Sequence, residues 1–79
     1  MIDHKEVIRI ATKYDKDSPG WVSCGIMPSD IIKGTQIELD WIIAGKYNKN
    51  WPNDVPDLEI AVNFAIARLI RDRWYYNRH

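Results

Sequence analysis

The sequence predicts an all-α fold: a small helical domain with a long C-terminal helix and at most one short strand-like segment, at residues 21–27. Three observations predict it. Apolar residues recur with helical periodicity near the N-terminus and again after residue 56. Capping boxes precede two predicted helices. Acidic residues open the last helix and arginines follow near its end, the order that the helix dipole favours. The 79 residues are expected to form a single domain over positions 1–79.

The first helix is predicted from a capping box, Asp3 with Glu6, and extends for about three turns. Apolar residues then follow at helical spacing. The alternative is a strand with residues 8, 10, 12 and 14 on one face. It would place the apolar residues Val7 and Ala11 among polar ones, so we favour a helix. The apolar stripe is Val7, Ile10, Ala11 and Tyr14.

The next segment contains most of the predicted turns. Residues 17–20 read D-S-P-G, a turn sequence, and residues 21–27 suit a short strand or an extended loop that Pro28 ends. Ser29 can cap a short helical turn, which Gly34 interrupts. Thr35 and Glu38 form a second capping box. A second helix is therefore predicted over residues 36–44, with a left-handed residue at position 45. Residues 36–41 also alternate as a strand would, but the alternation fails at 42 and 43.

The last helix is predicted from about Pro56, with Asp54 as its cap, to about Tyr76, a length of some 30 Å. It has two apolar stripes on nearly opposite sides, so it must be covered on both. The other two helices can cover one stripe. The second stripe needs either residues 21–27 or another protein chain. The first stripe is Leu58, Ala61, Val62, Ala65, Leu69 and Tyr76, and the second is Ile60, Phe64, Ala67 and Trp74, joined by Arg71.

Composition excludes several classes of protein. Eleven acidic and eleven basic residues give a net charge of zero. This argues against an acidic DNA mimic and against a basic nucleic-acid coat protein, so nucleic acid is not an expected partner. Cys24 is the single cysteine, so a reducing compartment is expected. No apolar run approaches the ~20 residues of a membrane span, and the first residues lack an apolar signal core. We expect a cytoplasmic protein without a membrane partner.

The residues that carry chemistry elsewhere form no site here. His4 and His79 have no ligand partner at metal-binding spacing. Glu38 and Asp40 are two residues apart, so on a helix they diverge and cannot act as an acid–base pair. The glycines are too scattered for a phosphate-binding loop, and no serine lies in a nucleophile motif. We therefore expect neither an enzyme nor a cofactor- or metal-binding protein.

The C-terminal run 71–78, R-D-R-W-Y-Y-N-R, has the composition of a binding surface. Arginine and aromatic residues dominate protein-interface hot spots, and they also stack on nucleotides. The plainer interpretation is a helix end whose rings fold onto the core. Trp51, in the loop before the last helix, is open to the same two interpretations.

Residues 37–68 carry several motifs in a fixed order. Residues 37–47 read I-E-L-D-W-I-I-A-G-K-Y, followed by Pro52, by V-P-D-L at 55–58 and by I-A-R at 66–68, and residues 74–78 read W-Y-Y-N-R. In order and spacing this span resembles the head–tail adaptor (neck or connector) proteins of tailed phages, especially those of the Mu-like branch. The resemblance covers about two fifths of the chain.

The resemblance implies a structural role without catalytic residues. Such adaptors form a ring of identical subunits beneath the portal and dock the tail. The implied partners are portal proteins, tail proteins and other copies of the chain, and the implied location is the host cytoplasm during assembly and then the virion neck. The ring contact joins two different faces. We expect it to use Ile60, Phe64, Arg71, Trp74 and Arg78, while the loop reaches the portal or the next ring through Lys46, Tyr47 and Trp51.

Two alternatives remain open from the sequence. One is a small phage regulatory or inhibitory protein that binds a host protein. The other is a nucleic-acid-binding module that uses the arginine and aromatic residues of the C-terminus, although net neutrality counts against it.

Overall fold

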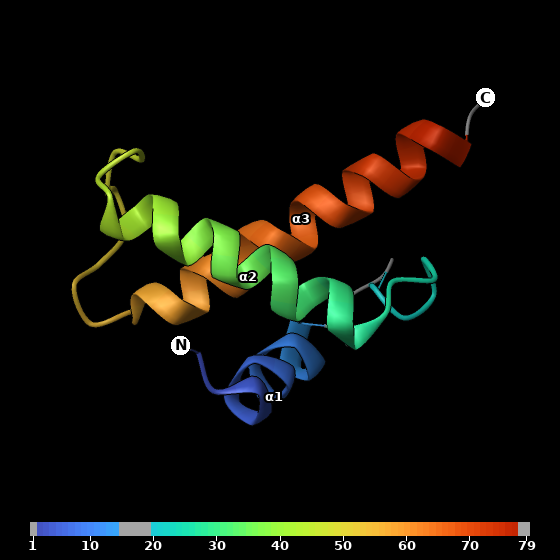
Figure 1. The fold of residues 1–79 in the computed structure, drawn as a ribbon, viewed down its shortest axis with the longest axis horizontal. Helices are drawn as coiled ribbons and strands as arrows, with labels where there is room; N and C mark the ends of the chain where they lie inside the picture. The colour runs from blue at the N-terminus through green and yellow to red at the C-terminus, as the bar shows by residue number, and fades with distance from the viewer. Residues whose placement is uncertain (1, 15–19, 78–79) are drawn as a thin grey trace.

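Within the described residues, three helices pack around a shared apolar core. The computed structural model describes residues 2–14 and 20–77, with side chains as far as residue 73. The helices are α1 (His4–Tyr14), α2 (Pro28–Ile43) and α3 (Asp57–Asn77). Helices α2 and α3 cross and make the most extensive contact, and α1 packs against both (Figure 1). No strand occurs in this part of the chain, so the all-α prediction is confirmed, and residues 21–25 form turns.

The core lies where the three helices meet. Trp21 and Ile26 contribute to it from the segment between α1 and α2, so this segment covers the core without forming a strand. The indole N–H of Trp21 donates to the Ala11 carbonyl oxygen at 2.7 Å, which holds the turns against α1. The buried residues of the core cluster are Val7, Ile10, Ala11, Trp21, Ile26, Ile31, Val62 and Ile66.

Asp3 caps α1 as predicted, but the Glu6 carboxylate binds Arg9 and not the Asp3 backbone, so the predicted capping box is only half formed. An Asp3 carboxylate oxygen accepts the backbone N–H groups of Lys5 at 3.0 Å and Glu6 at 3.4 Å. The Glu6 carboxylate pairs with Arg9 one turn later, at 3.0 Å from its Nε. Val7, Ile10 and Ala11 are buried, so the predicted apolar stripe faces the core.

The predicted break at Gly34 is wrong, because α2 runs unbroken through that residue. Pro28 opens the helix instead of ending the preceding segment, and the Asp30 carboxylate accepts the Met27 N–H at 3.2 Å. Thr35 is therefore not a cap. It is fully buried in mid-helix, and its hydroxyl has no hydrogen-bond partner among the described residues.

Gly34 lies where α2 packs against Ala65 of α3. A Cβ atom added at this position would stand 3.1 Å from the Ala65 Cβ, closer than nearly all such contacts. Glycine therefore suits this position because of the neighbouring helix, and not because α2 breaks here. A glycine within a helical pattern more often marks an end, which is why the sequence pattern was misleading.

The predicted end of α2 is confirmed. Gly45 has φ +74°, the left-handed conformation that glycine adopts without strain. Its N–H donates to the Ile42 carbonyl at 3.1 Å, and the Lys46 N–H donates to the Trp41 carbonyl at 3.0 Å. These two bonds form a Schellman motif, which turns the chain into the loop before α3.

Helix α3 begins at Asp57, one residue after the predicted start. The Pro56 carbonyl accepts the N–H groups of Glu59 at 3.0 Å and Ile60 at 3.3 Å, so Asp54 lies too early to cap the helix. The Asp57 carboxylate instead binds the loop, with Lys49 Nζ at 2.9 Å and Trp51 Nε1 at 3.3 Å. The C-terminal half of α3 extends past its crossing with α2 (Figure 1).

Candidate functional site

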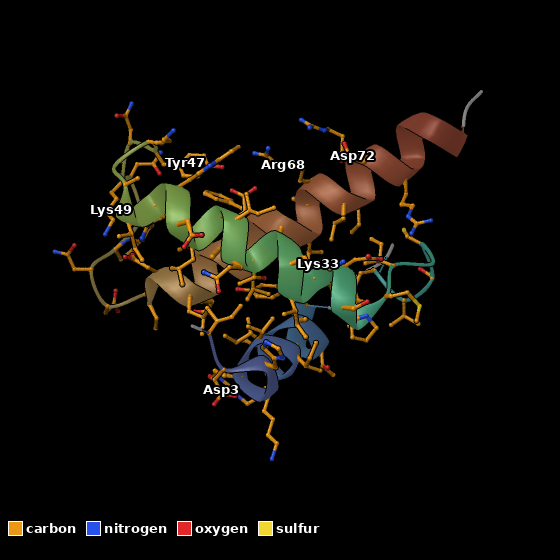
Figure 2. All side chains as sticks on the ribbon, viewed as in Figure 1. Asp3, Lys33, Tyr47, Lys49, Arg68 and Asp72 are labelled. Atoms are coloured by element: carbon orange, nitrogen blue, oxygen red, sulfur yellow. The ribbon has the colours of Figure 1, made fainter. Side chains whose placement is uncertain are left out.

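A buried carboxylate joins α2, the loop and α3. Glu38 is only 2% exposed, and one of its oxygens accepts a bond from Arg68 Nε at 3.0 Å. The Tyr47 hydroxyl donates to the other oxygen and accepts from Arg68 Nη2 at 3.2 Å. Figure 2 shows Tyr47 near the C-terminal end of α2 and Arg68 on α3. We call these three residues the Glu38 network. It satisfies a charge that is costly to bury alone.

The Glu38 network also holds an aromatic ring. The Arg68 guanidinium lies over the Trp41 ring, 5.4 Å from its centroid. Trp41 and Tyr47 in turn are 6.2 Å apart between ring centroids. Arg68 therefore makes an ion pair, a hydrogen bond and a cation–π contact with two different segments.

Tyr47 makes the stability that the Glu38 network contributes depend on pH. Its donation to Glu38, aided by burial, raises the pKa of the Tyr47 hydroxyl above its usual value. A group whose pKa is raised by folding adds stability that is fully present below the unfolded pKa, about 10 for tyrosine, and is lost as the pH rises through the folded value. The contribution of Tyr47 should therefore vanish only in alkaline solution.

Replacing Tyr47 by phenylalanine is expected to reduce the free energy of unfolding by about 1–3 kcal/mol at neutral pH, because Glu38 loses a hydrogen-bond donor. Above about pH 10 the difference from the wild type should shrink, because the Tyr47 hydroxyl then loses its proton in the unfolded chain before it does so in the folded protein. Urea unfolding at neutral and alkaline pH measures both effects. Tyr14, whose pKa is also raised, is present in both proteins and cancels. A difference that is independent of pH would contradict the assignment.

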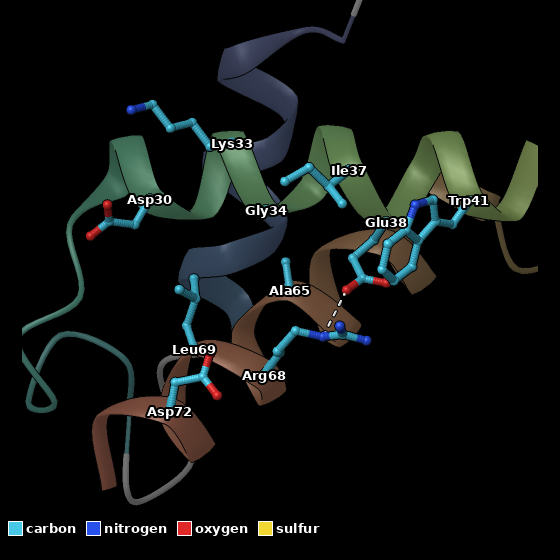
Figure 3. A pocket seen from close by; sticks show the side chains of 10 residues that line it. All are labelled: Asp30, Lys33, Gly34, Ile37, Glu38, Trp41, Ala65, Arg68, Leu69 and Asp72. Atoms are coloured by element: carbon cyan, nitrogen blue, oxygen red, sulfur yellow. Dashed lines mark ion pairs between the residues drawn. The ribbon is translucent and has the colours of Figure 1, made fainter. Parts of the chain in front are cut away.

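A groove of about 500 Å³ lies between α2 and α3 (Figure 3). Gly34 and Ala65, at the crossing, are among its lining residues. Ile37 and Trp41 line it from α2 and are 52% and 37% exposed, which is unusual for large apolar side chains. The lining residues of this α2–α3 groove are Asp30, Lys33, Gly34, Ile37, Glu38, Trp41, Ala65, Arg68, Leu69 and Asp72.

The α2–α3 groove was not predicted from the sequence. Ile37 and Trp41 are four residues apart, so they share a face of α2, and that spacing was visible in the sequence. The face was overlooked because the helix was predicted to begin only at residue 36, which left too few turns to define two sides.

A second, shallower hollow of about 260 Å³ lies between the loop and α3. The Phe64 ring packs under two loop rings, with centroid distances of 5.3 Å to Tyr47 and 6.0 Å to Trp51. The loop thus covers part of the second apolar stripe of α3, a role that the sequence had assigned to residues 21–27 or to another chain. The lining residues of this loop–α3 hollow are Tyr47, Phe64, Ala67, Arg68 and Arg71.

The structure brings together some of the predicted contact residues. Tyr47, Phe64 and Arg71 line the loop–α3 hollow, and Trp51 packs on Phe64. Tyr47 and Trp51 are half-buried against their own chain, which leaves Lys46 as the fully exposed member of the loop set.

The remaining predicted contact residues lie on α3 or after it. Ile60 is half-buried, and Arg71 is exposed with its guanidinium 3.7 Å from the Asp72 carboxylate. Trp74 belongs to α3, but its side chain and the whole of Arg78 lie outside the described residues.

The described side chains include no group of three histidine, cysteine, aspartate or glutamate residues placed to hold a metal ion. Within the same part of the chain, no helix has both the length and the apolar character of a membrane span. No family model, curated protein or solved structure matches this chain.

Proposed function

We propose that this chain is a head–tail adaptor of a tailed phage or prophage, a structural subunit that assembles as a ring on the portal and docks the tail. The observation that carries the proposal is the loop–α3 hollow. Two residues assigned to the ring contact, Phe64 and Arg71, line it together with Tyr47, which was assigned to the loop contact. Tyr47 is 17 positions before Phe64 and 24 positions before Arg71 in the sequence, yet the three residues line one surface.

The motif residues themselves support the proposal. Glu38 and Tyr47 lie near the two ends of the motif at residues 37–47, Arg68 belongs to the motif at 66–68, and in the structure the three residues bond to one another. Gly45, from the same span, makes the turn that brings Tyr47 back over α3. The span that carries the motifs folds as one unit, a helix, a turn and a second helix.

A ring requires that one face of each subunit meet a different face of the next. The stripe of Ile60 and Arg71 on α3 supplies one face, with a half-buried apolar side chain and an exposed cation. In this role the subunit needs no catalytic residue and no cofactor. It assembles in the host cytoplasm and remains in the virion neck.

The proposal is tested by co-expressing the tagged chain with the portal protein of the same genome and purifying it through the tag. The wild type is expected to retain the portal. Arg71→Glu, which reverses a charge beside the hollow, is expected to lose at least about tenfold in portal retention or ring formation.

The matched control is Lys5→Glu, the same change of charge on an exposed residue of α1. It should behave as the wild type. If the portal is retained neither by the wild type nor by the control, the adaptor assignment fails.

One observation favours a second candidate, a small regulatory protein that binds a single host protein. The α2–α3 groove has apolar walls and the volume of a ligand- or side-chain-binding site, and no residue of the described chain fills it. The same purification distinguishes the two. A stoichiometric host protein in place of the portal would support the regulator.

A further inference from the structure

We propose that α2 binds a second copy of this chain, antiparallel and about a twofold axis near Ile37, through its outer face. This face consists of Lys33, Ile37, Asp40 and Ala44, which lie away from the buried residues Ile31 and Ile42 of α2, and Trp41 lies at its edge, where it lines the α2–α3 groove and contacts Arg68. The inference concerns the free protein and does not rest on the proposed function.

The outer face of α2 carries two opposite charges without ion-pair partners. Lys33 and Asp40 are exposed, and neither makes an ion pair with any described residue. They are seven residues apart, which places them on one side of the helix but about 10 Å apart along its axis, too far to pair with each other. Asp40 accepts a bond from the Gln36 amide at 3.0 Å through one oxygen, and its other oxygen stays available.

One exposed apolar side chain, Ile37, lies between these charges, and Trp41 directly follows Asp40. Ile37 is 52% exposed and Trp41 is 37% exposed, and Figure 3 shows both along α2 with Lys33. The outward side of a surface helix is ordinarily polar. An exposed isoleucine between a lysine and an aspartate, with a tryptophan at the edge of the same face, has the pattern of an interface centre with a charged rim.

The charges select the occupant and its direction. In an antiparallel pair centred near residue 37, Lys33 of each copy faces Asp40 of the other, and the two Ile37 side chains meet at the axis. The contact is self-complementary, as a twofold dimer requires. A parallel pair in register would place lysine on lysine and aspartate on aspartate, which is unfavourable. The face therefore fits a second copy of itself.

This contact uses α2, whereas the ring contact was assigned to Ile60 and Arg71 on α3. The two surfaces differ, so the free protein can form this dimer whatever the outcome with the portal. Two single helix faces bury little area, and the dimer is expected to be weak and reversible.

Sedimentation equilibrium of the full chain, up to about 1 mM, detects contacts as weak as a millimolar dissociation constant. The wild type is expected to form dimers. Lys33→Asp and Asp40→Lys should each weaken self-association at least about tenfold, because each places like charges opposite one another. An equimolar mixture of the two variants should form a heterodimer, since one copy then carries aspartate at both positions and the other carries lysine at both, so that each pair again joins opposite charges.

Lys5→Asp, the same change of charge on α1, is the control and should leave the dimer intact. Recovery in the mixture also shows that both variants fold. The proposal is overturned by a wild type that stays monomeric at every concentration, by single reversals that have no effect, or by a mixture that does not recover. Rings of free subunits without a dimer would overturn it as well, while supporting the adaptor function. If the wild type fails to retain the portal, only the proposed adaptor function is contradicted, and the dimer proposal is unaffected.

Discussion

Replacing Trp21 by alanine is expected to lower the free energy of unfolding by about 3–5 kcal/mol, the usual range for removing a buried aromatic side chain. Trp21 is 6% exposed and lies in the core cluster. It also donates to the Ala11 carbonyl, a contact that fixes the turns between α1 and α2. A chain of this length has a total stability of about 4–12 kcal/mol, so the loss is a large share of it.

Urea unfolding followed by far-ultraviolet circular dichroism measures this loss without relying on tryptophan fluorescence. Trp41→Ala is the matched control, because Trp41 is the same residue type but 37% exposed, and it should lose less than half as much. Trp21→Phe keeps most of the apolar ring and removes the N–H donor. Its loss of unfolding free energy should lie between those of Trp21→Ala and Trp41→Ala. A Trp21→Ala variant no less stable than Trp41→Ala would show that residues 21–26 do not complete the core.

Replacing Arg68 by alanine is expected to cost about 2–4 kcal/mol, because Glu38 would remain buried without its cation. The lower part of the range reflects the 45% exposure of the Arg68 side chain, since its removal lets water approach the carboxylate. The cation–π contact with Trp41 is lost as well. Denaturant unfolding at neutral pH measures the effect.

Arg71→Ala serves as the control for Arg68→Ala. Arg71 is one turn further along α3, and its ion pair joins it to the adjacent, exposed Asp72, so the change should be within about 0.5 kcal/mol. The double variant Glu38→Leu/Arg68→Met removes both charges and is expected to recover most of the loss, because no buried charge is left unpaired. If Arg68→Ala and Arg71→Ala lowered the free energy of unfolding equally, the Glu38 network would not stabilise the packing of α2 against α3.

Local sequence rules predicted the parts of this fold that local interactions determine. The Asp3 cap and apolar stripe of α1, the left-handed Gly45 and the length of α3 all depend on residues within a few positions of one another. Each is confirmed by the structure, apart from shifts of about one residue at the helix ends. Such boundaries commonly vary by this amount.

The errors occur where distant segments decide the outcome. Gly34 was predicted to break the helix, because glycine is a poor helix former. Its actual neighbour, Ala65, is 31 positions away on another helix, so local sequence could not reveal the contact. Glu38 was treated as part of a cap, although a cation from α3 and a hydroxyl from the loop allow it to be buried in mid-helix. A carboxylate is ordinarily a surface residue, so no pattern along the chain predicts this environment.

In the candidate surfaces, too, the features within one helix were predicted and the contacts between distant segments were not. The sequence correctly indicated that one stripe of α3 contains Phe64 and Arg71, but not that Tyr47 and Trp51 would fold over it. The exposed pair Ile37 and Trp41 was missed because half of α2 was not predicted as helix. Side-chain contacts across the loop and α3 depend on the path of the loop, which residue spacing does not define.

Native mass spectrometry of the chain co-purified with the portal protein of its own genome tests the adaptor function most directly, because it counts subunits. We expect one dominant complex, in which a fixed number of copies, well above two, is bound to each portal ring. Arg71→Glu is expected to disrupt this complex. A portal that carries no copy, or only one or two copies, of this chain would contradict the adaptor function.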